Sequence, residues 1–162
     1  MEKLKILLTK PPGFNLDEFD RDQNKIRYYD LYPPAALATI AASALKKVSN
    51  VEIEILDLEF EILKYFQENE ISALSTRDAM KKLIIDKMEQ FSPDLCGITV
   101  MFSPSHENAL KVANIVKQKK QNIKIICGGN HATFAYKRML EKCQSLDFIF
   151  LYEGDHTFQL FL

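Results

Sequence analysis

The chain has 162 residues, of which 47% are hydrophobic and 27% are charged, so it can bury one core of ordinary size and is not disordered. Its formal net charge of -1 gives no electrostatic reason to expect nucleic acid or an anionic membrane as a partner. The three cysteines, an odd number without close spacing, argue against a disulfide framework and favour a reducing, cytoplasmic location.

Strand and helix signals alternate along the chain, and no run is apolar for long enough to be a signal peptide or a membrane span. Five short runs predict strands over residues 4–8, 51–55, 95–101, 123–127 and 147–151. Helices are expected to begin at Pro33-Pro34, at the capping box Ser75 to Asp78, at Ser103-Pro104, near Ala132 and near Phe158. Repeated strand–helix units predict a doubly wound parallel sheet with helices on both faces.

The second strand differs from the others in its pattern. Val51 to Ile55 alternates apolar and acidic residues, whereas the first, third and fourth strands are almost purely apolar. An alternating strand is half exposed, so the second strand is expected at an edge of the sheet. A flavodoxin-like (Rossmann-like) order, 2-1-3-4-5, meets this requirement and places the fifth strand at the other edge. We therefore predict one α/β domain over residues 1–162.

Two connections are unusually long, and loops of such length in compact domains usually bind ligands or cover sites. Residues 10–33 join the first strand to its helix, so we expect this loop to hang over a ligand cleft at the carboxyl end of that strand. Residues 58–74 precede the next helix and are expected to hold a short helix around Phe60 to Phe66.

The pair Gly128-Gly129 follows a buried strand and precedes a helix, which brings bare backbone close to a ligand. Ser103 and Gly154 hold the equivalent place after the third and fifth strands. The carboxyl ends of these strands meet at one edge of the sheet, where open α/β proteins bind their ligands. The sequence therefore predicts a binding cleft there.

Other ligand sites of α/β proteins fit this chain less well. A dinucleotide-binding turn needs three glycines after the first strand, where residues 9–13 offer one glycine behind two prolines. The prolines also lack the free amides that a phosphate loop requires. His106, His131 and His156 all follow strand ends, but their spacing matches no zinc motif. His131 alone, beside the glycine pair, remains a candidate ligand contact.

Four segments, taken in order, resemble the amino-terminal cobalamin (B12)-binding domain of B12-dependent radical SAM enzymes. The segments are Lys10-Pro11-Pro12, Tyr32 to Ala38, Gly128 to Thr133 and Glu153 to Phe158. The resemblance implies a cobalamin on the carboxyl edge of the sheet, with its nucleotide tail beside strands one, three and four. The residues that it implies as contacts are Pro11, Pro12, Thr99, Met101, Ser103, Gly128, Gly129, His131, Glu153 and Gly154.

The chain also departs from the family. The familiar cobalamin domains supply a lower axial histidine from the loop after the first strand, and residues 10–33 contain no histidine. Tyr152 stands where the family often has glycine. No Cys-x-x-x-Cys-x-x-Cys motif is present, so a 4Fe-4S cluster and S-adenosylmethionine would have to be bound by a separate radical SAM domain.

We therefore expect a cobalamin-binding domain of a radical SAM enzyme, cut before its catalytic domain, because Phe158 to Leu162 reads as a helix that has only begun. The domain by itself is not expected to be an enzyme. Two rival hypotheses stay open. The first is a degenerate domain that no longer binds cobalamin and presents substrate or stabilises a catalytic partner. The second is another small-molecule-binding α/β domain, such as half of a nucleotide-dependent transferase.

Overall fold

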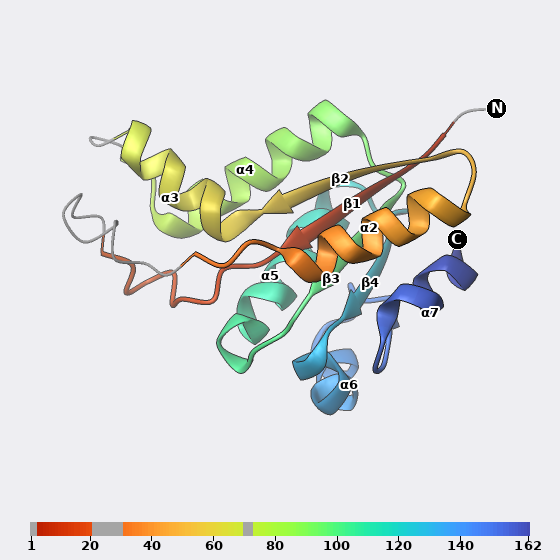
Figure 1. Cartoon of the computed structure of the whole chain (residues 1–162). Helices are drawn as coiled ribbons and strands as arrows, with labels where there is room; N and C mark the ends of the chain where they lie inside the picture. Colours follow the sequence, from red (N-terminus) through yellow and green to blue (C-terminus); the bar gives the residue numbers. More distant parts are fainter. Residues whose placement is uncertain (1–2, 21–30, 70–72) are drawn as a thin grey trace.

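The computed structural model describes residues 3–20, 31–69 and 73–162 and consists of one sheet between two layers of helices (Figure 1). All neighbouring strands are parallel, and the order β2-β1-β3-β4-β5 confirms the predicted topology, including the second and fifth strands at the edges. The strands are β1 (Leu4–Lys10), β2 (Val51–Asp57), β3 (Leu95–Thr99), β4 (Lys124–Gly128) and β5 (Phe148–Ile149).

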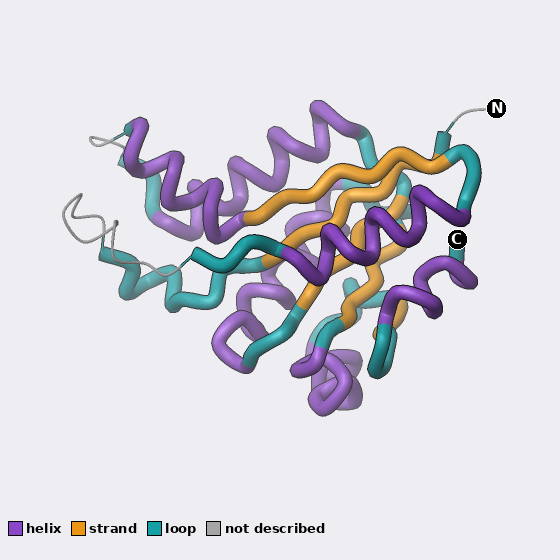
Figure 2. The backbone as a smooth tube through the Cα atoms, viewed as in Figure 1, coloured by secondary structure: helices purple, strands orange, loops and turns teal. Residues whose placement is uncertain are grey.

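The two faces of the sheet are covered by different helices, as Figure 2 shows. One face packs against α3 (Leu58–Glu68), α4 (Thr76–Phe91), α5 (His106–Lys119) and α6 (Asn130–Lys142). The other face packs against α2 (Ala35–Lys47) and α7 (Gly154–Phe161). No helix in the described residues is long and apolar enough to cross a membrane.

Side chains alternate between these faces along each strand because successive residues of a strand point in opposite directions. In β1, Leu7 belongs to the core under α3 to α6, whereas Ile6 and Leu8 belong to the core under α2 and α7. The thiols of Cys96 and Cys127 lie in the first of these cores, and burial raises the pKa of each to about 12. They act as small apolar side chains in this core.

Several predicted boundaries move by a few residues. The third strand ends at Thr99 rather than at residue 101, and the fifth is only two residues long. The helix expected at Ser103-Pro104 begins as a short 3-10 turn, Ser103–Ser105, before α5. The capping box is confirmed, because Ser75 Oγ accepts a hydrogen bond from the Asp78 amide at 3.0 Å.

The short helix expected around Phe60 to Phe66 is confirmed, but it is longer than predicted, because most of the connection at residues 58–74 forms α3. The carboxylate of Asp57 ends β2 and caps the next helix at once, accepting hydrogen bonds from the amides of Glu59 and Phe60. The buried side chains of α3 recur at helical spacing and are Leu58, Ile62, Leu63 and Phe66.

The described part of the first long loop also departs from expectation. Residues 11–20 do not hang over the α2 and α7 face; Leu16 and Phe19 join the opposite core, where the ring of Phe19 lies 5.7 Å from that of Phe66. The buried side chain of Asn108 on α5 donates hydrogen bonds to the carbonyls of Pro12 (3.0 Å) and Phe14 (2.9 Å). The rest of the loop, residues 21–30, lies outside the described residues.

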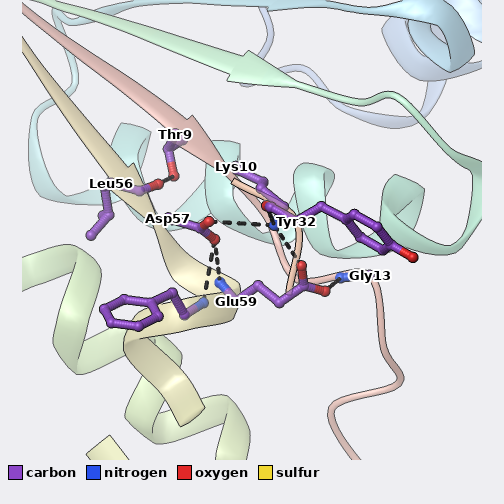
Figure 3. Close-up of polar contacts among 8 residues, drawn as sticks. Thr9, Lys10, Gly13, Tyr32, Leu56, Asp57 and Glu59 are labelled. Carbon is purple, nitrogen blue, oxygen red and sulfur yellow. Dashed lines mark hydrogen bonds and ion pairs between the residues drawn. The ribbon is translucent and has the colours of Figure 1, made fainter. Parts of the chain in front are cut away.

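Lys10 joins the two ends of this loop to β2 (Figure 3). Its ammonium lies 2.6 Å from Glu59 Oε2 and 3.3 Å from Asp57 Oδ2, and it donates to the carbonyl of Tyr32 at 2.8 Å. The second oxygen of Glu59 accepts from the amide of Gly13 at 2.9 Å. The side chains of Lys10, Asp57 and Glu59 are mostly buried, so their charges are poorly screened by water.

Replacing Lys10 by methionine removes the cation and leaves two mostly buried carboxylates without it. We expect the Lys10→Met substitution to lower the free energy of unfolding by about 3 kcal/mol, measured by urea denaturation. Lys82→Met is the matched control, because Lys82 pairs with Asp86 on the exposed surface of α4. Loss of this ion pair should change the free energy of unfolding little. Equal losses in the two variants would contradict the structural role of Lys10.

Candidate ligand-binding site

A cavity of about 500 Å³ lies between the sheet and helices α2 and α7, within the size range of small-molecule sites. Its floor is formed by the carboxyl halves of β1, β3 and β4, and its walls by the amino-terminal turns of α2 and α7. The residues that line it are Leu8, Ala36, Leu37, Thr39, Ile40, Gly97, Ile98, Thr99, Met101, Ile126, Gly128, Gly129, Asn130, Thr133, Phe134, Phe150, Tyr152, Glu153, Gly154, Asp155 and Phe158.

Two glycines on neighbouring strands open the floor of this cavity. Gly97 is in register with Leu8 and Ile126, and Gly128 is in register with Thr99. A Cβ at Gly97 would lie 2.7 Å from Leu8 Cδ2, and a Cβ at Gly128 would lie 3.8 Å from Phe150. A side chain at Gly97 would therefore clash with Leu8, whereas a side chain at Gly128 would have room to extend into the cavity beside Phe150.

Gly129 has a different role, because it joins β4 to α6 in a conformation that only glycine readily adopts. Its φ of 108° and ψ of 172° lie in a region nearly closed to other residues. A Cβ here would lie 2.7 Å from the carbonyl oxygen of Val100. That oxygen accepts a hydrogen bond from the amide of His131 at 3.0 Å, so α6 begins against the end of β3.

The polar groups around the cavity are acidic or neutral. Glu153 and Asp155 stand beside it at the beginning of α7, together with hydroxyl and amide side chains such as Thr99 and Asn130. Among the lining residues that the structure describes there is no lysine, arginine or histidine. The cavity therefore suits a ligand part that donates hydrogen bonds better than a polyanion.

A second, open hollow of about 700 Å³ adjoins the cavity at the same edge of the sheet and shares Met101, Asn130 and Phe134 with it. Its cationic residues are Lys137 and Arg138 of α6. The two recesses thus differ in charge, with carboxylates beside the cavity and cations beside the hollow.

His131, which lines the hollow, belongs to a chain of three hydrogen-bonded side chains. Its Nδ1 lies 3.1 Å from Ser103 Oγ, and its Nε2 lies 2.8 Å from His106 Nδ1. The second ring nitrogen of His106, Nε2, is buried and has no hydrogen-bond partner in the described residues. An orphaned N–H at that nitrogen would be costly, so the arrangement favours the tautomer with the proton on His106 Nδ1. His131 then accepts at Nε2 and donates from Nδ1 to Ser103.

Burial lowers the pKa of His106 below its ordinary value of 6.5, and the charge of His131 acts in the same direction. The carboxylate of Glu107, 4.0 Å from His106 Nε2, acts in the opposite direction, whereas Arg138 and Lys142 lower the pKa further. The buried imidazole is therefore neutral at neutral pH.

The structure brings most of the predicted site residues to this edge of the sheet. Six of them line the cavity: Thr99, Met101, Gly128, Gly129, Glu153 and Gly154. Ser103 and His131 line the adjoining hollow. Pro11 and Pro12 are buried and line neither recess.

Sequence reasoning missed Gly97 and the wall from α2. A glycine inside the apolar run of β3 is the signal that could have identified Gly97, since it marks a close approach to the backbone. Ala36, Thr39 and Ile40 carry no such signal, because small and apolar residues on a helix usually pack against a sheet.

The histidines do not converge on a metal. His106 and His131 are hydrogen-bonded to each other, and His156 lies exposed on α7. The described residues contain no group of three histidine, cysteine or acidic side chains placed to hold a metal ion.

Residues 25–162 match the B12 binding domain family. The chain belongs to this family. It is 28% identical over 119 residues to an uncharacterized methyltransferase of Pyrococcus horikoshii, which covers 72% of this chain and 26% of that protein. It is 35% identical over 82 residues to the cytidylyl-2-hydroxyethylphosphonate methyltransferase of Streptomyces wedmorensis, covering 49% of this chain and 15% of the relative.

A third relative is the anaerobic magnesium-protoporphyrin IX monomethyl ester cyclase of Rubrivivax gelatinosus, 29% identical over 82 residues. The match covers 51% of this B12-binding domain and 15% of the cyclase. The matched part of this chain thus spans about a quarter of the first relative and less of the other two.

The cavity is compatible with the nucleotide tail of cobalamin in one physical respect, which is that its floor carries no side chain at Gly97 and Gly128. The two positions lie on adjacent strands beneath the carboxyl edge, so an extended group can enter between the sheet and the two helices.

The two glycines of the pair should respond differently to alanine. We expect Gly129→Ala to lower the free energy of unfolding by about 1 to 3 kcal/mol, because alanine is strained at this φ and ψ and meets Val100. Gly128 does not have a positive φ and has room for a methyl group, so Gly128→Ala should change stability much less. Chemical denaturation of both variants tests the difference, and similar losses would refute it.

The stability of the domain should depend on the protonation of His106. Because the pKa of His106 is lower in the folded chain than its ordinary 6.5, the unfolded chain binds more protons as the pH falls through that value. The stability associated with this group is complete above about pH 6.5 and is lost below it. His106→Gln should flatten this part of a plot of unfolding free energy against pH; an unchanged slope would exclude His106 as its source.

Proposed function

We propose that this domain binds cobalamin, with the nucleotide tail in the cavity between the sheet and helices α2 and α7. The observation that carries the proposal is this cavity, whose floor includes Gly97 and Gly128 and lies beneath the carboxyl edge of the adjacent strands β1, β3 and β4. Membership of the B12-binding family supports the same ligand.

The charge of the cavity supports cobalamin over a nucleotide cofactor. A dinucleotide or nucleoside diphosphate brings several negative charges, which usually meet cations or the amides of a glycine-rich loop. Here the lining residues include Glu153 and Asp155, and none of those in the described part of the chain is a cation. Cobalamin carries many amide groups around its macrocycle, and carboxylates at the mouth can accept hydrogen bonds from them.

The residues that would hold the cofactor are those of the cavity and of the adjoining hollow. Gly97 and Gly128 leave room for the nucleotide tail, and Thr99 supplies a hydroxyl group on the floor of the cavity. Ser103 and His131 line the hollow and face the part of the cofactor that remains outside the cavity. The hydroxyl oxygen of Ser103 accepts a hydrogen bond from His131 Nδ1, so the hydroxyl proton of Ser103 is available for donation to a ligand oxygen. Bound cobalamin would supply a cobalt centre able to carry a methyl group or to modulate a radical.

We propose further that the cofactor serves a radical SAM enzyme. Two of the relatives are named as methyltransferases and one as a cyclase, and this chain spans a minor part of each. The chain has no Cys-x-x-x-Cys-x-x-Cys motif, so the iron–sulfur cluster would belong to another domain. The sequence encoded after Leu162 tests this proposal, because three cysteines spaced by three and two residues are expected there and their absence would exclude that parentage.

Cobalamin binding is tested on the purified chain with hydroxocobalamin. We expect corrin absorbance to remain with the protein after desalting, and Gly128→Leu to abolish it, because the larger side chain occupies the cavity. Gly128→Ala is the control, since its methyl group adds little volume. Circular dichroism shows whether each variant is folded. If the folded wild-type chain retains no corrin, the cofactor assignment fails and the degenerate, structural domain becomes the better hypothesis.

A further inference from the structure

Tyr152 has an unfavourable backbone conformation beside the cavity. Its φ is 62°, in the left-handed region where a bulky side chain is rare and costs energy, whereas glycine adopts it freely. The residue is 80% exposed, so burial of the side chain does not offset this cost. Residues kept in such conformations concentrate at ligand-binding sites.

A hydrogen bond explains the conformation but not the side chain. The amide of Tyr152 donates to Thr133 Oγ1 at 2.9 Å, and that hydroxyl donates to the carbonyl of Gly129 at 3.1 Å. The bond ties the loop after β5 to the first turn of α6. A glycine at position 152 would offer the same amide, so the bond gives no reason for an aromatic ring.

Phe134 provides a second exposed ring at the same place. It follows Thr133 on α6, is 82% exposed, and lines the cavity together with Tyr152. Two large apolar side chains left in water beside one cavity indicate a surface that is covered when a partner binds. Because both rings line the cavity itself, its ligand is a better candidate for that cover than a distant protein surface.

We propose that Tyr152 and Phe134 form an aromatic clamp that contacts the part of the ligand remaining outside the cavity. The proposal rests on cobalamin as the ligand, whose broad macrocycle is too large to follow the tail into about 500 Å³. Aromatic rings pack well against such a surface and lose little conformational freedom in doing so. The clamp strengthens binding at the expense of the stability of the free domain.

The Tyr152→Gly substitution should therefore raise the stability of the free domain and lower its affinity for the ligand. We expect the variant to unfold at a higher urea concentration than the wild-type chain, since glycine removes the strain. We also expect it to bind hydroxocobalamin about tenfold more weakly in an equilibrium titration, because the ring contact is lost. Tyr152→Phe keeps the ring and the strain, so it should retain wild-type affinity.

Phe134→Ala should weaken binding by a similar factor, whereas Phe60→Ala, which removes an exposed ring from α3 on the opposite face, should not. Wild-type affinity in both Tyr152→Gly and Phe134→Ala would overturn the clamp while leaving the proposed function intact. A Tyr152→Gly variant that loses both affinity and stability would also overturn the clamp. Variants that keep cobalamin but no longer associate with a radical SAM domain would assign the rings to a protein interface and equally overturn the clamp. A wild-type chain that binds no hydroxocobalamin would overturn both proposals together.

Discussion

A sheet that is buried on both faces needs close packing on both, and here the face under α2 and α7 leaves a cavity at the carboxyl edge. Under α3 to α6 the strands present large side chains such as Ile98 and Ile125. On the other face, Ile6, Leu95 and Phe158 pack between the sheet and helices α2 and α7. Gly97 and Gly128 interrupt this second layer. The helices cannot close the gap, because the packed residues hold them at the distance that full side chains require.

The first long loop depends on contacts that keep its beginning away from this gap. Lys10 ties both ends of the loop to β2, and Asn108 holds its first carbonyls on the packed face. Leu16 and Phe19 then add to the core rather than to the binding site. One strand end thus supports two different structures: a packed loop on one side of the sheet and an open recess on the other.

The sequence was sufficient to predict the sheet because its signals are local. The alternation from Val51 to Ile55 placed β2 at an edge, and the glycine pair marked the carboxyl edge of β4, as the structure confirms. The direction of the first loop was not predictable in this way, since Asn108 belongs to a helix far along the chain. Helix α3 was underestimated because Asp57 ends a strand and caps a helix with no intervening residue. Tyr152 was noted only as a departure from the family, and the positive φ supplies the physical reason why glycine suits that position.

The short fifth strand has a consequence for how the recess is entered. Phe148 and Ile149 pair with β4, and the amides of Asp147 and Phe150 add one hydrogen bond each to that strand, yet this short attachment carries α7, one of the two walls. Helix α7 is also held by contacts with α2, including the hydrogen bond from Gln159 to Ser43, and by the rings of Phe158 and Phe161, which contact Phe150. Detaching this wall disrupts far less structure than moving α2, which is followed by the full length of β2. Local opening at the β5 edge is therefore the least costly route inward. Amide hydrogen exchange in α7 would slow when a bound ligand joins the two walls.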